Sequence, residues 1–245
     1  MAHPTLLESV VGVREPLGRG LIVVIVALGA LHVVAVVTAS FWRTATPTLR
    51  STVGAWFHLD SEAGLGTWFA VLQLALAATI AALIAARERS EGRTWRGWAF
   101  VAAVLAAMSL DEQILAHEQL GRVAASMGLA VGGVSPWFLV APVVLVIVGC
   151  VVMPFAARLL RRTRRGLIVA GAVFVLGALG FELLSWAYVL LIAHDPAAAL
   201  SPVVGVLQLC EESLELLGVT LAISALLDHA WSTARSPLGA HSTTP

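Results

Sequence analysis

Acidic side chains inside hydrophobic stretches are the residues of this chain best suited to chemistry. An ionised carboxylate is costly to insert at bilayer depth, and such residues usually face a bundle interior, where they mark ion, proton or metal sites. The candidate ligands lie in or directly after such stretches: Asp111, Glu112, His117, Glu118, Glu182, Glu211, Glu212 and Glu215. They occur in three separate stretches, so a common site requires three helices to meet at one depth.

Depth and angular position both favour a common site. At about 1.5 Å rise per residue, the acids of all three stretches lie roughly 12 to 18 Å below the outer ends of their helices. Asp111 and Glu118 project within about 20° of each other, and the three acids of the last stretch share one stripe. Gly177 and Gly180 precede Glu182 and would permit close helix approach.

Metal binding would explain these residue types. Carboxylates a few ångströms apart disfavour one another's ionisation. The basic residue nearest to this acidic layer is Arg122, in the loop beyond the third span. Bound cations, shared protons or water must therefore compensate the negative charge of the acids. Oxygen ligands with an imidazole suit a divalent metal such as iron, manganese, zinc or calcium, and His117 is the best nitrogen ligand. The pattern differs from the Glu-x-x-His of ferritin-like di-iron bundles, because no His stands three residues after Glu112, Glu182 or Glu215.

Three further histidines have weaker claims as ligands. His32, His58 and His194 would serve only if their segments approach the acidic layer. A lone histidine on an apolar face is more often a packed, hydrogen-bonded side chain. We therefore read His32 as a packing residue.

Composition places the chain among membrane proteins. Of its 245 residues, 59 % are hydrophobic and 12 % are charged, and the mean hydropathy is +0.90, whereas soluble domains are about one quarter charged. Six apolar stretches reach the roughly 20 residues that cross a hydrocarbon core. The sequence therefore predicts an all-α, six-helix transmembrane bundle with spans at about 20–42, 64–86, 97–120, 136–157, 167–193 and 203–227. These spans form a single membrane domain, 1–231, followed by a disordered cytoplasmic tail, 232–245.

Helix-start chemistry precedes three of the predicted spans. Ser135–Pro136 and Ser201–Pro202 each offer a hydroxyl N-cap followed by proline at the first helical position. Before the second span, Asp60 or Ser61 is placed to act as N-cap, with Glu62 in the first turn. Asp60 and Glu62 are accordingly read as helix-start residues and not as ligands.

Arginine sets the expected orientation, since every basic residue of the chain is Arg. With a cytoplasmic N-terminus, 12 of the 15 arginines fall in inner segments, and only Arg43, Arg50 and Arg122 lie outside. The positive-inside rule then predicts that both termini are cytoplasmic, in the inner (plasma) membrane of a bacterium. The run 158–165 is read first as an orientation signal and second as a contact for anionic lipid heads.

Three sequence blocks resemble a known kind of protein. They are S-L-D-E-x4-H-E (Ser109–Glu118), E-E-x-L-E-x2-G (Glu211–Gly218) and F-H-L-D-S-E-A-G-L-G-T-W-F (Phe57–Phe69). They resemble a group of uncharacterised bacterial multi-pass membrane proteins, over roughly the second to sixth spans. The resemblance implies a shared site and no particular reaction.

Three classes of function remain open. The first is a metal-dependent membrane enzyme acting on a lipid-like substrate, and the second is a cation or proton-coupled transporter with the acids as a relay. The third is a non-catalytic subunit or sensor. Membrane lipids, a lipid-like substrate or a cation are the expected partners, and no nucleic-acid partner is expected. The inner halves of the predicted spans contain few ionisable groups, and this scarcity weighs against transport. A metal-binding site is therefore favoured.

Overall fold

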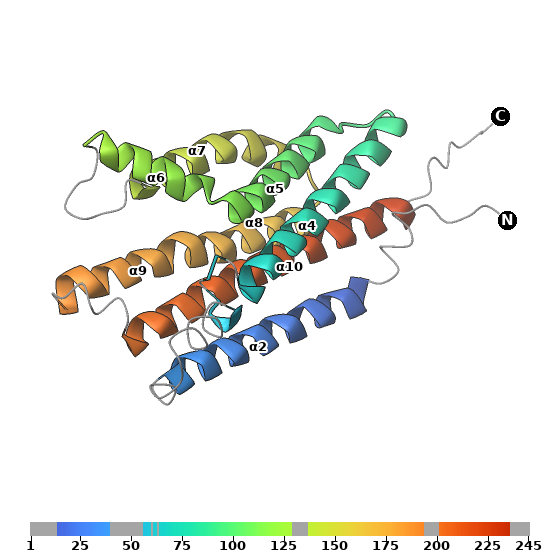
Figure 1. Ribbon diagram of the computed structural model, residues 1–245. Coiled ribbons are helices and arrows are strands. Elements are labelled where there is room, and N and C mark those ends of the chain that lie inside the picture. Colours follow the sequence, from blue (N-terminus) through green and yellow to red (C-terminus); the bar gives the residue numbers. More distant parts are fainter. Residues whose placement is uncertain are drawn as a thin grey trace, which may run out of the picture.

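The computed structural model describes residues 14–39, 56–59, 61–62, 64–128, 137–193 and 201–235, and every regular element in this part is a helix. In chain order the helices are α2 (Arg14–Ala39), α4 (Leu65–Ser90), α5 (Arg96–Ile114), α6 (Ala116–Ser126), α7 (Trp137–Ala156), α8 (Arg161–Val175), η2 (Leu176–Phe181), α9 (Glu182–Ala187), η3 (Tyr188–Ala193) and α10 (Pro202–Arg235). The helix α10 contacts α2, α4 and α8 along its length (Figure 1). The π-helical turns η2 and η3 continue α8 as one long rod.

The lengths and apolar composition of these helices identify a membrane protein. In the described residues, four helices are long and apolar enough to cross a bilayer: Arg14–Val37, Leu65–Ser90, Arg96–Ile114 and Arg161–Ile192. A shorter apolar helix covers Val140–Ala156. The predicted spans 136–157 and 203–227 correspond to α7 and α10, which are not among these four.

The start of α2 and the end of α10 lie at the same end of the bundle. Arg14 in α2 is 3.7 Å from Asp228 in α10, and Arg162, near the start of α8, binds the same carboxylate at 2.7 Å. Trp98 of α5 packs against His229 of α10, with ring centroids 4.6 Å apart. We call this the arginine-rich end, because the starts of α2, α5 and α8 bring their arginines to it.

A dense apolar core lies between α4, α5 and α10 near the arginine-rich end. It includes the buried side chains Ile80, Ile84, Trp98, Ile223, Leu226 and Leu227. Trp98 is 2 % exposed and meets Phe155 of α7 edge-on, with ring centroids 5.0 Å apart. The tightest apolar packing therefore lies away from the acidic layer.

The structure divides the predicted span 97–120 into two helices. The helix α5 ends at Ile114, Leu115 adopts the left-handed conformation (φ 54°, ψ 43°), and α6 begins at Ala116. Figure 1 shows α6 leaving the direction of α5 at this point. His117 therefore belongs to a different helix from Asp111, and the single polar face expected for this span is broken.

The helix starts follow the predictions in part. The helix α10 begins at Pro202, and the Ser201 hydroxyl accepts a hydrogen bond from the Val204 N–H at 3.4 Å, as its N-cap role predicts. The start of α4 differs, since Gly64 is the N-cap and provides no side-chain bond. Of the predicted tail 232–245, residues 232–235 still belong to α10 and are not disordered. Ser135–Pro136, Asp60 and residues 236–245 lie outside the described residues.

Candidate functional site

Asp111 and His117 are joined by two hydrogen bonds across the break between α5 and α6. The backbone N–H of His117 donates to Asp111 Oδ1 at 2.9 Å, and His117 Nδ1 lies 2.7 Å from Asp111 Oδ2. An ionised carboxylate can only accept, so we assign the imidazole proton to Nδ1. One carboxylate thus holds both the backbone and the ring of His117.

The bond to the backbone caps α6. The first N–H groups of a helix have no acceptor within the helix, and Leu115, the N-cap of α6, makes no side-chain cap bond. Asp111 supplies an acceptor there and brings negative charge to the positive end of the helix dipole. A left-handed residue other than glycine costs about 1–2 kcal/mol, and the bonds from Asp111 offset this cost at Leu115.

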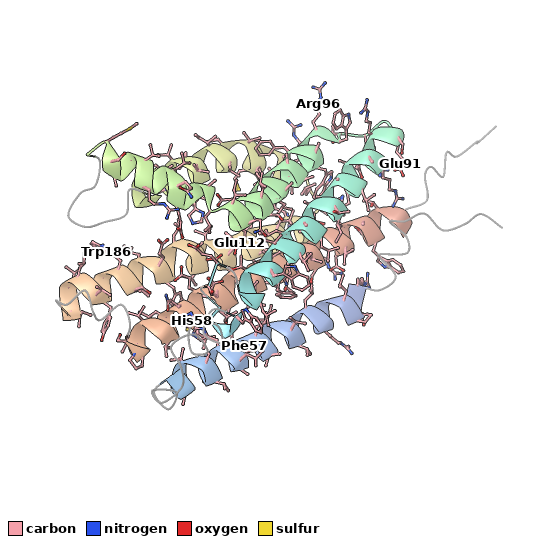
Figure 2. All side chains as sticks on the ribbon, in the orientation of Figure 1. Phe57, His58, Glu91, Arg96, Glu112 and Trp186 are labelled. Carbon is pink, nitrogen blue, oxygen red and sulfur yellow. The ribbon has the colours of Figure 1, made fainter. Side chains whose placement is uncertain are left out.

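Glu112 completes a group of three at this break. It is half-buried and lies within electrostatic range of both Asp111 and His117. Figure 2 shows it on the side of α5 that faces α9 and α10. We call Asp111, Glu112 and His117 the elbow group.

Two acids of α10 lie where that helix meets η2. A Cβ atom on Gly177 of η2 would lie 2.7 Å from the Glu211 carbonyl oxygen and 3.0 Å from Glu215 Cγ. Only glycine permits this approach without a shift of the backbone. The close helix contact predicted for Gly177 is thereby confirmed, and it brings Glu211 and Glu215 to the η2 interface.

Glu212 projects beside this interface. At 100° per residue it is about 60° from Glu215 and about 40° from Leu216. Leu216 packs with Leu28 of α2 and Leu59. Glu212 therefore points between the stripe of α10 that meets η2 and the stripe that meets α2.

Glu182 starts α9 directly after η2, and α9 also contacts α10. π-Helical turns often occur at functional sites. Four acids of the two helices are each engaged in at least one interaction: Glu182, Glu211, Glu212 and Glu215. We call these four residues the α10 group.

The elbow group and the α10 group do not form a ready metal centre. In the part of the chain that the structure describes, no three His, Cys, Asp or Glu side chains are placed to hold a metal ion together. Glu118 is half-buried in the first turn of α6, where the helix dipole favours an acid. Metal binding by the predicted residues stays a prediction.

Among the described histidines outside the elbow group, His32 connects α2 to Leu59 and to α10. His32 is 1 % exposed, its Nδ1 accepts the Leu59 N–H at 3.0 Å, and its Nε2 consequently donates to the Gly205 carbonyl at 3.1 Å. The packing role predicted for His32 is therefore confirmed. The ring of His58 lies 4.4 Å from that of His32, and both His58 and Phe57 lie beside α2 and α10 in Figure 2. His194 lies outside the described residues.

The sequence reasoning missed two polar pairs in the bundle interior. Gln73 Nε2 of α4 donates to Thr220 Oγ1 of α10 at 2.9 Å, while Gln73 Oε1 is buried without a partner in the described part. Near the arginine-rich end, Thr163 lies 3.4 Å from Nδ1 of the buried His229, whose Nε2 also has no partner among the described residues. A single polar residue within an apolar stretch of sequence could have indicated these pairs, because such residues form hydrogen bonds between helices in membranes.

A family described as a domain of unknown function (DUF8692) matches residues 3–230 of the chain. Comparison with curated proteins and with solved structures found no match.

Proposed function

The chain belongs to this family, and we propose that it binds a divalent metal at the elbow group, in the outer half of the bilayer. Such a site supports metal-dependent chemistry on a lipid-like substrate, with the metal activating water or polarising an oxygen. His117 and Glu112 are the proposed ligands. Asp111 is the proposed positioning residue.

The hydrogen bond between Asp111 and His117 is the observation on which the proposal rests. Metal-ligating histidines usually donate their other ring N–H to a carboxylate, which fixes the tautomer and makes the ligating nitrogen more basic. Asp111 Oδ2 accepts the Nδ1–H of His117 in this way, which leaves Nε2 as the nitrogen proposed to bind the cation. Glu112 adds a carboxylate within electrostatic range of the same ring.

The α10 group supports the elbow group through its charge. Clefts lined by one sign of charge raise the local concentration of the opposite ion. The four glutamates of this group belong to α9 and α10, the helices that Glu112 faces in Figure 2. In the proposal, Glu182 and Glu212 provide further oxygen ligands once a cation draws the two groups together.

The apolar core favours a site reached from one side over a path through the membrane. Beyond Thr220, α10 buries Ile223, Leu226 and Leu227, each at most 1 % exposed, against Trp98 of α5. A relay across the bilayer needs ionisable or hydrated groups along its path. Tight apolar packing between α4, α5 and α10 supports an enzyme or binding site more than a transporter.

The proposed topology has six spans with both termini cytoplasmic, in the inner membrane of a bacterium. The shared contacts of Arg14 and Arg162 with Asp228 support it, because they bring the start of α2, the start of α8 and the end of α10 together. An even number of crossings produces this arrangement. The elbow group then belongs to the outer half.

Elemental analysis of protein purified without chelator tests the proposal. We expect stoichiometric iron, manganese, zinc or calcium in the wild type and a loss of it in Glu112→Gln and His117→Ala. Glu62→Gln is the matched control, because Glu62 is an exposed acid just before α4. A wild type without stoichiometric metal overturns the proposal, and proton-coupled cation uptake abolished by Glu112→Gln would establish transport instead.

A further inference from the structure

Five arginines gather where α7 ends and α8 begins: Arg158, Arg161, Arg162, Arg164 and Arg165. Of these five, Arg162 alone forms an ion pair within the described part of the chain, with Asp228. Arg158, Arg161 and Arg165 are exposed. This turn therefore presents a dense positive charge that the described acids leave largely uncompensated.

The first turn of α8 adds to that positive charge. Leu160, its N-cap, makes no side-chain cap bond, and the first turn contains no acidic residue. The N-terminal N–H groups and the positive end of the helix dipole both favour an anion. The backbone and the arginine side chains thus prefer the same kind of ligand.

One face of the α8 rod is basic at its start and apolar beyond. Arg161 and Arg165 are followed on this face by the exposed side chains Ile168, Val169 and Leu176. At 100° per residue these five positions fall within about a 100° arc. Arg165 and Leu176 are about 16 Å apart along the axis, close to half of the roughly 30 Å hydrocarbon core. The face matches one leaflet in both polarity and length.

We propose that this face of α8 is a binding site for an anionic phospholipid. The guanidinium groups of Arg161 and Arg165 hold the phosphate in the bidentate manner typical of arginine. The acyl chains lie along Ile168, Val169 and Leu176. The site is independent of the metal proposal, since it lies at the arginine-rich end and shares no residue with the elbow group.

The test is the full chain reconstituted into phosphatidylcholine nanodiscs with or without phosphatidylglycerol, read by thermal unfolding and by the lipids retained in native mass spectrometry. We expect phosphatidylglycerol to raise the Tm of the wild type and to remain bound, and Arg161→Gln/Arg165→Gln to lose both effects. Arg19→Gln/Arg96→Gln is the control, because it removes the same charge from two exposed arginines of other helices.

Two outcomes would overturn the site. One is an equal response of both double variants, which would mean nonspecific attraction to a basic surface. The other is stabilisation by inorganic phosphate in phosphatidylcholine alone, which would mean a free-anion site. Arg161→Lys/Arg165→Lys keeps the positive charge that orients the helix, but it removes the planar guanidinium groups that can bind a phosphate through two hydrogen bonds. We expect this pair to retain less phosphatidylglycerol than the wild type, and retention equal to the wild type would refute the bidentate contact.

Discussion

The carboxylate of Asp111 bonds His117 twice, at the backbone N–H (2.9 Å) and at ring Nδ1 (2.7 Å). Both oxygens of Asp111 are thereby committed to one residue of the next helix. The relationship explains how α6 starts at a left-handed leucine, and it separates Asp111 from the other acids of the layer. Asp111 positions a histidine, whereas Glu112 and His117 are the residues proposed to meet a cation.

Removal of the Asp111 carboxylate should loosen α6. We expect Asp111→Ala to lower the free energy of unfolding by about 1 kcal/mol, the usual cost of a lost helix cap. Amide hydrogen exchange should accelerate at the first turn of α6 more than in α5. Glu62→Gln is the control, since it removes an exposed carboxylate just before α4 and leaves α6 unchanged. Unchanged exchange in α6 of Asp111→Ala would contradict the capping role.

The left-handed conformation of Leu115 should make this position prefer glycine over a β-branched residue. Leu115→Gly removes backbone strain of about 1–2 kcal/mol while losing a half-buried side chain. Leu115→Val keeps an apolar side chain but restricts the backbone further. We expect thermal unfolding to rank Leu115→Val below Leu115→Gly, and the reverse order would argue against the left-handed break.

Gly177 should tolerate no larger residue. A Cβ there would meet the Glu211 carbonyl oxygen at 2.7 Å, so Gly177→Ala must push η2 away from α10, at a cost of about 1–3 kcal/mol. Gly171→Ala is the control on the same rod, because a Cβ at Gly171 would meet nothing within 4 Å. It should be neutral or slightly stabilising in thermal unfolding. Equal effects of the two variants would refute the close contact.

Acid should weaken the packing of residues 56–59 on α2 and α10. Burial lowers the pKa of His58 from its ordinary value of 6.5, so the unfolded chain binds a proton that the folded chain disfavours. The contribution of the buried, neutral His58 to the free energy of unfolding is therefore fully present above about pH 6.5. It falls as the pH drops from there toward the lower pKa of His58 in the folded chain. We expect His58→Phe to keep the ring contact with His32 and to show a shallower fall in Tm from pH 7.5 to 5. A slope identical to that of the wild type would contradict this role.

The membrane class and the helix at Pro202 could be read from the sequence, because they depend on local physics. Apolar stretches of sufficient length define membrane helices, and the Ser-Pro pair at 201–202 combines a hydroxyl cap with a proline suited to the first turn. His32 was also foreseeable as a packing residue, since a buried imidazole needs partners for both nitrogens.

The break at Leu115 could not be foreseen, because residues 109–120 contain no Gly, Pro or Asn to mark a helix end. The left-handed conformation depends on contacts between separate residues, above all the two bonds from Asp111. The π-turn η2 is likewise a tertiary feature, in which Gly177 signals close approach without indicating the type of helix. The acidic residues were therefore identifiable, whereas their separation into an elbow group and an α10 group was not.

The most direct test of the central claim is whether His117 ligates a bound metal. Electron spin-echo spectroscopy of the Mn²⁺-loaded protein detects a nitrogen atom bonded to the manganese. We predict a nitrogen signal in the wild type and in Glu62→Gln, a weakened signal in Asp111→Ala, where the ring is no longer oriented, and none in His117→Ala. Stoichiometric Mn²⁺ with no nitrogen signal in the wild type, or a signal that persists in His117→Ala, would contradict the account.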